Sequence, residues 1–254
     1  MLDQQQKYLP DPRSFQILET TLYTHDGGLL LLSKHLDRMR RSARLLSEKY
    51  PDCFPVDCVS ATAVETRLRQ ALLPNNQPQL QQGRARILLS ADGSLDVQII
   101  PAAAATTSAR QPLLVLDTQP TENLQDSPFV ACKTTHRRIY DAAAARTLEP
   151  AMKYPDGSLV LLYNSDGCIT EANIANVAVS LPAGGDKVAE LQLVTPPVSA
   201  GLLAGTMRSQ LLEAGQIVEG PVTVDDFRRA AQNGWPVVCM NSVRGLFGVT
   251  PVAP

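Results

Sequence analysis

The sequence has few aromatic residues and few histidines. Phe, Trp and Tyr make up 5% of its 254 residues, and there is a single tryptophan. The three histidines, His25, His35 and His136, are far apart in the chain, so we predict no histidine-rich metal site. No apolar run approaches the roughly 18 residues that a membrane-spanning helix needs, which excludes such a helix.

The sequence also lacks an excess of either charge. Its 23 basic and 25 acidic residues leave a net charge of −2. Because affinity for a phosphate backbone comes from clustered Lys and Arg, this balance argues against a general nucleic-acid-binding protein. The five cysteines are odd in number and scattered without a CxxC pair, and the first residues lack the apolar core of a classical secretory signal. These features predict a reduced, cytoplasmic protein.

The length allows one to two domains with a sizeable core. Strand pairs and helices are mixed along the chain and lack the regular strand–helix alternation of a parallel sheet. This favours an α+β fold in two subdomains. The predicted division is a loose leader over 1–13, a first subdomain over 14–117, a linker over 118–128 and a second subdomain over 129–254.

Periodicity and turn residues predict the individual elements. Ser33 is expected to cap a helix over 34–50, and Thr62 with Glu65 to form a capping box. Thr223 and Asp226 form the same pattern before the last helix. Further helices are predicted over 62–73, 136–149 and 203–214, and strands over 15–23, 84–89, 95–100, 113–116, 158–163 and 168–180. The apolar run 129–132 is predicted to be a buried strand.

Four segments carry the residues of chemical interest: 35–39, 132–140, 166–177 and 195–208. In this order and spacing they resemble the fold type IV pyridoxal-phosphate enzymes. The resemblance runs from about residue 15 to residue 252. That family includes branched-chain and D-amino acid aminotransferases and aminodeoxychorismate lyase. The resemblance implies a small N-terminal α/β subdomain, a larger barrel-like C-terminal subdomain, and a homodimer.

The resemblance assigns the catalytic lysine and the ring partner. Pyridoxal 5′-phosphate needs an amine for its aldehyde, and Lys133 matches it. A lysine at the end of a buried strand is costly unless it has a function. The pyridine nitrogen needs an anion, and Glu171 with Asn176 meets the family's E-x-x-x-x-N spacing.

The cofactor's phosphate needs hydrogen-bond donors. Gly205 and Thr206 open, or lie early in, the helix predicted over 203–214, where backbone N–H groups and the helix dipole favour a dianion. The resemblance implies Arg38 as the charged partner. Asn241 and Ser242 fall where the family places a further hydroxyl.

The chain departs from the family in two ways. Met207 stands where a threonine is common, so one hydroxyl is lost. The family's usual N-terminal strands, with their glycine-rich approach to the first strand, are missing or much reduced.

Two reactions compete within the family. The runs 133–141 and 241–245 resemble lyase-type members, fungal ones especially. This implies cleavage of 4-amino-4-deoxychorismate to 4-aminobenzoate and pyruvate, a step of folate biosynthesis. Transamination of the branched-chain or D-amino acid type remains the alternative. A non-catalytic member of the fold is a further alternative, although it would be expected to lack Lys133 or Glu171.

The lyase alternative adds substrate-binding candidates. Its substrate is a dicarboxylate, for which Arg86, Arg138 and Arg244 are candidates, although each is equally typical of a surface cation. Thr20 lies where the resemblance implies a hydroxyl able to protonate the departing enolpyruvyl carbon, and it is otherwise an ordinary strand threonine.

Overall fold

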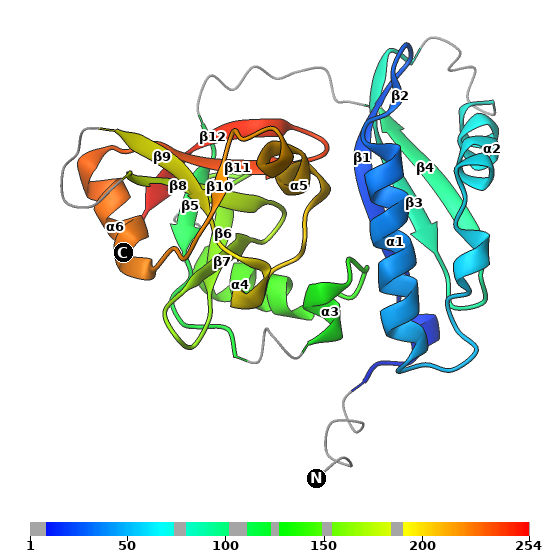
Figure 1. Ribbon diagram of the computed structural model, residues 1–254. Coiled ribbons are helices and arrows are strands. Elements are labelled where there is room, and N and C mark those ends of the chain that lie inside the picture. The colour runs from blue at the N-terminus through cyan, green and yellow to red at the C-terminus, as the bar shows by residue number, and fades with distance from the viewer. Residues whose placement is uncertain are drawn as a thin grey trace. The chain divides into compact units, whose positions relative to one another are not determined.

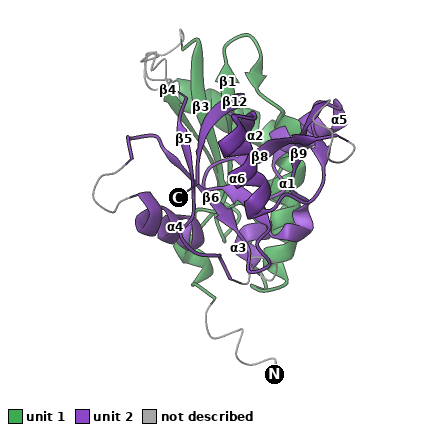
Figure 2. Ribbon diagram, turned by 90° about the vertical axis from the view of Figure 1, so that its left-hand side faces the viewer, with its two compact units in different colours: residues 1–102, 132–136 green, residues 103–131, 137–254 purple. Residues whose placement is uncertain are grey.

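The computed structural model describes residues 9–73, 80–101, 111–122, 127–148, 154–183 and 190–253. The chain forms two compact units (Figure 2). Unit 1 takes in Met1–Ala102 and Cys132–His136, and unit 2 takes in Ala103–Ala131 and Arg137–Pro254. Both helices and sheets are present in each, which confirms the α+β fold class. The strand at Leu113–Leu116 belongs to unit 2, whereas the predicted first subdomain over 14–117 includes it.

Unit 1 is an antiparallel sheet with two helices. Its strand order is β2-β1-β3-β4. The strands are β1 (Ile17–Thr24), β2 (Gly28–Leu29), β3 (Gln82–Leu89) and β4 (Leu95–Pro101), and the helices are α1 (Leu32–Ser47) and α2 (Ala61–Leu72). Short 3-10 turns stand at η2 (Pro12–Ser14) and η3 (Val56–Cys58). Helix α1 packs along β1 and α2 along β4 (Figure 1).

One stripe of α1 is buried. Leu36, Met39, Ala43 and Leu46 recur at helical spacing and are at most 4% exposed. This pattern turns one face of the helix toward the sheet. Three polar side chains, His35, Arg38 and Ser42, are buried on the same helix.

Both predicted caps of unit 1 are wrong. Helix α1 starts two residues earlier than expected, after Leu31 in a left-handed conformation, so Ser33 lies inside the first turn. Helix α2 begins at Ala61, and its cap is Ser60, whose hydroxyl accepts from the backbone N–H of Ala63. Ser60 is also a favourable capping residue, and it lies one position outside the helix, where the orphan N–H groups can be reached.

Unit 2 is built on a mixed eight-stranded sheet with the order β10-β9-β8-β11-β12-β5-β6-β7. The strands are β5 (Leu113–Leu116), β6 (Leu159–Tyr163), β7 (Ile169–Ala172), β8 (Asn176–Pro182), β9 (Leu191–Thr195), β10 (Val218–Glu219), β11 (Val237–Asn241) and β12 (Gly245–Val252). The helices are α3 (Pro128–Ala131), α4 (Arg138–Leu148), α5 (Thr206–Glu213) and α6 (Val224–Asn233), with a 3-10 turn at η5 (Val198–Ala200). Strand β12, which was not predicted, pairs with both β11 and β5.

The core of unit 2 lies between the sheet and α6. Phe227 and Ala230 of α6 are fully buried in one cluster with Val177, Val179 and Val237 of the strands. The predicted capping box forms: Thr223 accepts from the N–H of Asp226, and the Asp226 carboxylate accepts from the N–H of Thr223. Within the part of the chain that the structure describes, no helix is both long and apolar enough to cross a membrane.

The predicted strand over 129–132 is wrong. Pro128–Ala131 is a short helix, α3. Proline favours the first turn of a helix, where its missing N–H costs nothing. The carbonyl of Ser127, just before it, accepts from the N–H groups of Val130 and Ala131. The burial expected of a strand holds for Val130 and Cys132 all the same.

Candidate active site

Arg38 sits in a buried ion-pair cluster within unit 1. Its Nε and Nη2 atoms donate to the two carboxylate oxygens of Glu19 at 2.9 and 2.5 Å. His35 Nδ1 lies 2.6 Å from Glu19 Oε2. Glu19 and His35 are fully buried and Arg38 is 5% exposed. Burial alone would raise the pKa of Glu19, but Arg38 and His35 outweigh it and lower that pKa to about 2.

Glu19 is not among the site residues predicted from the sequence. The available signals were a carboxylate inside the apolar strand β1 and an arginine on the buried stripe of α1. A buried charge needs a partner, and these two residues supply one another.

Thr20 and Arg86 lie opposite each other on neighbouring strands. They are register partners in the β1–β3 pair. Because side chains alternate along a strand, Thr20 points to the face opposite that of Glu19. Arg86 is half-buried, and its Nη1 donates to Gln98 Oε1 of β4 at 3.4 Å. The structure therefore brings two of the predicted substrate-side residues together.

Lys133 is half-buried and lies in Cys132–His136, the short segment that belongs to unit 1 although the residues on either side of it belong to unit 2. Its carbonyl accepts from the N–H of Leu18 at 2.9 Å. The following residues continue this attachment, since Thr134 bridges Ile17 and the Thr135 hydroxyl accepts from the N–H of Gln16. The backbone of Lys133 and of the two residues after it is thus fixed to β1 and to Gln16, the residue before that strand.

Glu171 is the buried carboxylate of unit 2. It is 5% exposed and lies on β7. Its Oε1 accepts from the Tyr140 hydroxyl at 2.7 Å and from the N–H of Leu203 at 3.1 Å. Its Oε2 accepts from Asn176 Nδ2 at 3.1 Å. Hydrogen bonds to the charged form of a carboxyl favour that form, so this environment suits an anion.

Gly205 and Asn176 interlock. Gly205 is the N-cap of α5, and a Cβ at that position would lie 1.9 Å from Asn176 Oδ1. Asn176 also donates from Nδ2 to the carbonyl of Leu203 at 2.9 Å. Only glycine fits there, and its presence keeps the carboxylate-holding asparagine beside the start of the helix.

Two hydroxyl groups meet at the start of α5. Thr206, the first residue of the helix, has its Oγ1 2.6 Å from the Oγ of Ser242, and both residues are buried. Backbone N–H groups at a helix start and hydroxyls beside them form a set of donors suited to a phosphate. The structure brings Gly205, Thr206 and Ser242 together.

Three further predicted residues of unit 2 are Asn241, which directly precedes Ser242, and the arginines Arg138 and Arg244. Asn241 holds its own turn, because its Oδ1 accepts from the N–H groups of Val243 and Arg244 and its Nδ2 donates to the carbonyl of Ile174. Arg138 is the exposed first residue of α4. Arg244 is exposed, and its guanidinium lies 5.3 Å from the centroid of the Phe247 ring.

Arg208 of α5, which was not predicted as a site residue, links this helix to the segment before it and to β10. It is 4% exposed and donates to the carbonyl of Pro196 at 2.8 Å, and it forms an ion pair with Glu219. The neighbouring Met207, the departure from the family pattern, is 9% exposed.

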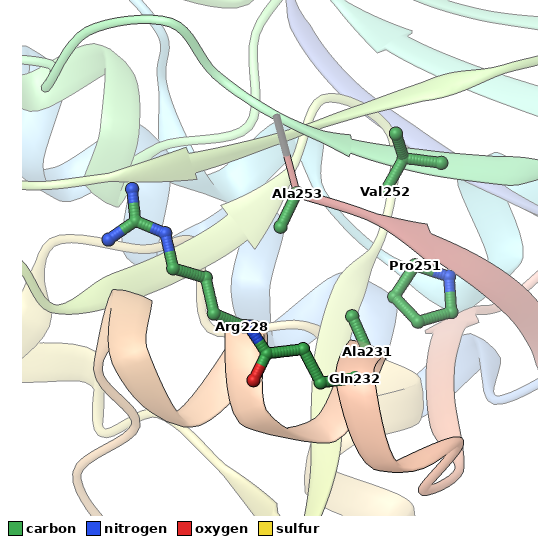
Figure 3. A pocket seen from close by; sticks show the side chains of 6 residues that line it. All are labelled: Arg228, Ala231, Gln232, Pro251, Val252 and Ala253. Carbon is green, nitrogen blue, oxygen red and sulfur yellow. The ribbon is translucent and has the colours of Figure 1, made fainter.

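A cavity of about 520 Å³ lies between α6 and the end of β12. It is lined by Arg228, Ala231 and Gln232 of the helix, by Pro251 and Val252 of the strand, and by Ala253 just after the strand (Figure 3). It contains none of the predicted site residues. Among the residues that the structure describes, no cluster of His, Cys, Asp and Glu could hold a metal ion.

The chain is similar to known proteins over nearly its whole length. Residues 16–252 match the family described as Amino-transferase class IV. A protein of Schizosaccharomyces pombe with the provisional name aminodeoxychorismate lyase is 36% identical over 94% of this chain and 90% of its own.

Two solved structures show the same fold. The 4-amino-4-deoxychorismate lyase of Pseudomonas aeruginosa has a TM-score of 0.61 and 20% identity, covering 93% of this chain and 83% of that one. A hypothetical aminotransferase from Mycobacterium tuberculosis, in a PLP-bound form, has a TM-score of 0.65 and 21% identity, covering 93% and 81%.

Proposed function

The chain belongs to the amino-transferase class IV family, and we propose that it is a pyridoxal-phosphate-dependent lyase of 4-amino-4-deoxychorismate. The observation that carries the proposal is the 36% identity to the Schizosaccharomyces pombe relative, which extends over nearly the whole of both chains. The buried carboxylate and the donors at the start of α5 support the same cofactor.

The residues of unit 2 fit the ring and phosphate of that cofactor. When bound, pyridoxal 5′-phosphate supplies an aldehyde for the substrate amine and a ring that accepts electrons. Glu171 would hold the proton of the ring nitrogen, and Asn176 would keep its carboxylate in place. Gly205, Thr206 and Ser242 would bind the phosphate, with Asn241 shaping the adjacent turn.

Unit 1 would supply the amine and one cation. Lys133 would bind the cofactor's aldehyde and then carry a proton from the substrate ring. Arg38 would donate to the phosphate. Its ion pair with Glu19 supports that role, because the carboxylate fixes the plane of the guanidinium before the phosphate arrives.

The lyase reaction needs no second substrate. A proton leaves the ring carbon that bears the amine, and the bond between the ring and the enolpyruvyl oxygen breaks. The released enolpyruvate then gains a proton at its methylene carbon and becomes pyruvate. Thr20 would deliver that proton, and its neighbour Arg86, with Arg138 and Arg244, would bind the carboxylates of the substrate.

We further propose a cytoplasmic homodimer that acts in folate biosynthesis. The scattered free cysteines support the location, since they are typical of a reducing compartment. Incubation of the purified protein with 4-amino-4-deoxychorismate tests the function. Formation of 4-aminobenzoate and pyruvate in equal amounts is expected, and absence of both products would contradict the lyase assignment.

A further inference from the structure

The hydroxyl of Tyr140 donates a short hydrogen bond to Glu171. It lies 2.7 Å from Oε1, compared with 3.1 Å each for the Leu203 N–H and Asn176 Nδ2. Asn176 and Leu203 come from the E-x-x-x-x-N pattern and from the segment before α5. Tyr140 comes from a separate element, helix α4, 31 residues before Glu171.

The phenol ring is held in place on more than one side. Tyr140 packs against the buried cluster of Ala143, Val160 and Leu162. On the ring itself, the Arg137 guanidinium lies 4.9 Å from the centroid, within the range of a cation–π contact. Arg137 in turn donates from Nη2 to the carbonyl of Asn173, two residues beyond Glu171, at 2.6 Å. The Tyr140 ring and the Glu171 carboxylate are therefore both linked to the segment between β7 and β8.

The direction of the hydrogen bond is fixed as well. Burial and the negative charge of Glu171 raise the pKa of Tyr140 well above its usual value near 10. The phenol therefore keeps its proton and acts as the donor. A donor at 2.7 Å favours the ionised form of Glu171 and restricts rotation of its carboxylate.

We propose that Tyr140 is a positioning residue, which holds the Glu171 carboxylate ionised and correctly oriented for the ring nitrogen of the cofactor. This inference rests on the proposed function, because it assumes that Glu171 faces that nitrogen. Tyr140 itself is assigned no contact with the substrate.

A double-mutant cycle on the full-length protein tests the inference. Cofactor-free protein is titrated with pyridoxal 5′-phosphate, and both the dissociation constant and the absorbance maximum of the bound form are measured. The variants are Tyr140→Phe, Glu171→Gln and the two combined. Tyr163→Phe is the matched control, since it removes a hydroxyl from a half-buried tyrosine of β6 in the same unit.

Tyr140→Phe is expected to weaken cofactor binding about tenfold, the effect of losing one hydrogen bond to a charged group. It should move the absorbance maximum in the same direction as Glu171→Gln but by less. In the Glu171→Gln background the same change should alter affinity less than twofold, because residues that act through one another are not additive. Tyr163→Phe should match the wild type.

Two results would overturn this inference and leave the proposed function intact. One is a wild-type affinity and spectrum in Tyr140→Phe. The other is an equal loss of affinity from Tyr140→Phe whether residue 171 is Glu or Gln. Additive effects would mean that Tyr140 only supports the packing of α4. A wild-type protein that binds no pyridoxal 5′-phosphate would overturn the proposed function, and this inference with it.

Discussion

The guanidinium of Arg38 donates two hydrogen bonds to the carboxylate of Glu19, at 2.9 and 2.5 Å, in the interior of unit 1. The pair joins helix α1 to strand β1, the two elements that carry Arg38 and Thr20. Buried charges are costly when isolated, so each residue depends on the other. The contact that would prepare Arg38 for an anion therefore also stabilises the fold around it.

Replacing Glu19 should destabilise the protein. Glu19→Gln leaves the Arg38 charge buried without its counter-ion, and we expect a loss of about 3 kcal/mol in the free energy of unfolding at pH 7. Urea denaturation followed by circular dichroism measures it. Glu65→Gln, at an exposed position of α2, is the control and should change stability by less than about 0.5 kcal/mol.

The Glu19 effect should depend on pH in a defined direction. The pKa of Glu19 is about 2 in the folded protein, against an ordinary value of 4.5. A lowered pKa stabilises the folded state above the ordinary value, and this stabilisation is lost as the pH falls toward 2. The stability difference between wild type and Glu19→Gln should therefore shrink below about pH 4.5. A constant difference between pH 7 and pH 3 would contradict this assignment.

Arg38→Lys should weaken cofactor binding. Lysine keeps the charge but loses the planar guanidinium, which binds Glu19 through Nε and Nη2 and whose other N–H groups would donate to the phosphate. We expect affinity for pyridoxal 5′-phosphate to fall about tenfold to a hundredfold, equivalent to roughly 1.5–3 kcal/mol. Arg41→Lys, at an exposed position of the same helix, serves as the control. Equal affinity in the two variants would remove Arg38 from the phosphate site.

Gly205→Ala should disturb the site from the side of α5. The added Cβ would lie 1.9 Å from Asn176 Oδ1, so Asn176 must move and its hydrogen bond to Glu171 must change. A loss of about 1–3 kcal/mol in stability and weaker cofactor retention on gel filtration are expected. Gly248→Ala is the control, because the atoms nearest its Cβ belong to the Gln111 side chain, which can move. Full cofactor retention in Gly205→Ala would contradict the packing argument.

Lys133 should be the point of covalent attachment. Treating the cofactor-loaded protein with borohydride should fix the cofactor to the peptide that contains Lys133, as detected by mass spectrometry. Lys133→Ala should show no such adduct, whereas the exposed Lys49→Ala should behave like the wild type. An adduct on another lysine in the wild type would reassign the catalytic amine.

Local signals in the sequence were sufficient where a few neighbouring residues decide the structure. The capping box of Thr223 and Asp226 is an example. The neighbouring helix α5 also forms, but it begins at Thr206, three residues later than predicted. The strand predicted over 129–132 failed because apolar periodicity over four residues does not separate a strand from a buried turn of helix. Pro128 was the signal that favoured the helix.

Partners distant in sequence could not be predicted in this way. Glu19 and Arg38 are 19 residues apart, and Tyr140 and Glu171 are 31 apart. Each contact depends on how a helix packs on a sheet. The roles implied for Arg138 and Arg244 stay predictions, because both side chains are exposed.

The most direct test of the central claim is the number of turnovers without a 2-oxo acid acceptor. The purified protein, loaded with pyridoxal 5′-phosphate, is mixed with excess 4-amino-4-deoxychorismate, and 4-aminobenzoate is counted per active site. A lyase restores its cofactor in every cycle, so the account predicts many equivalents of 4-aminobenzoate with matching pyruvate. Turnover that requires added 2-oxoglutarate, with no pyruvate released, would contradict it and identify an aminotransferase.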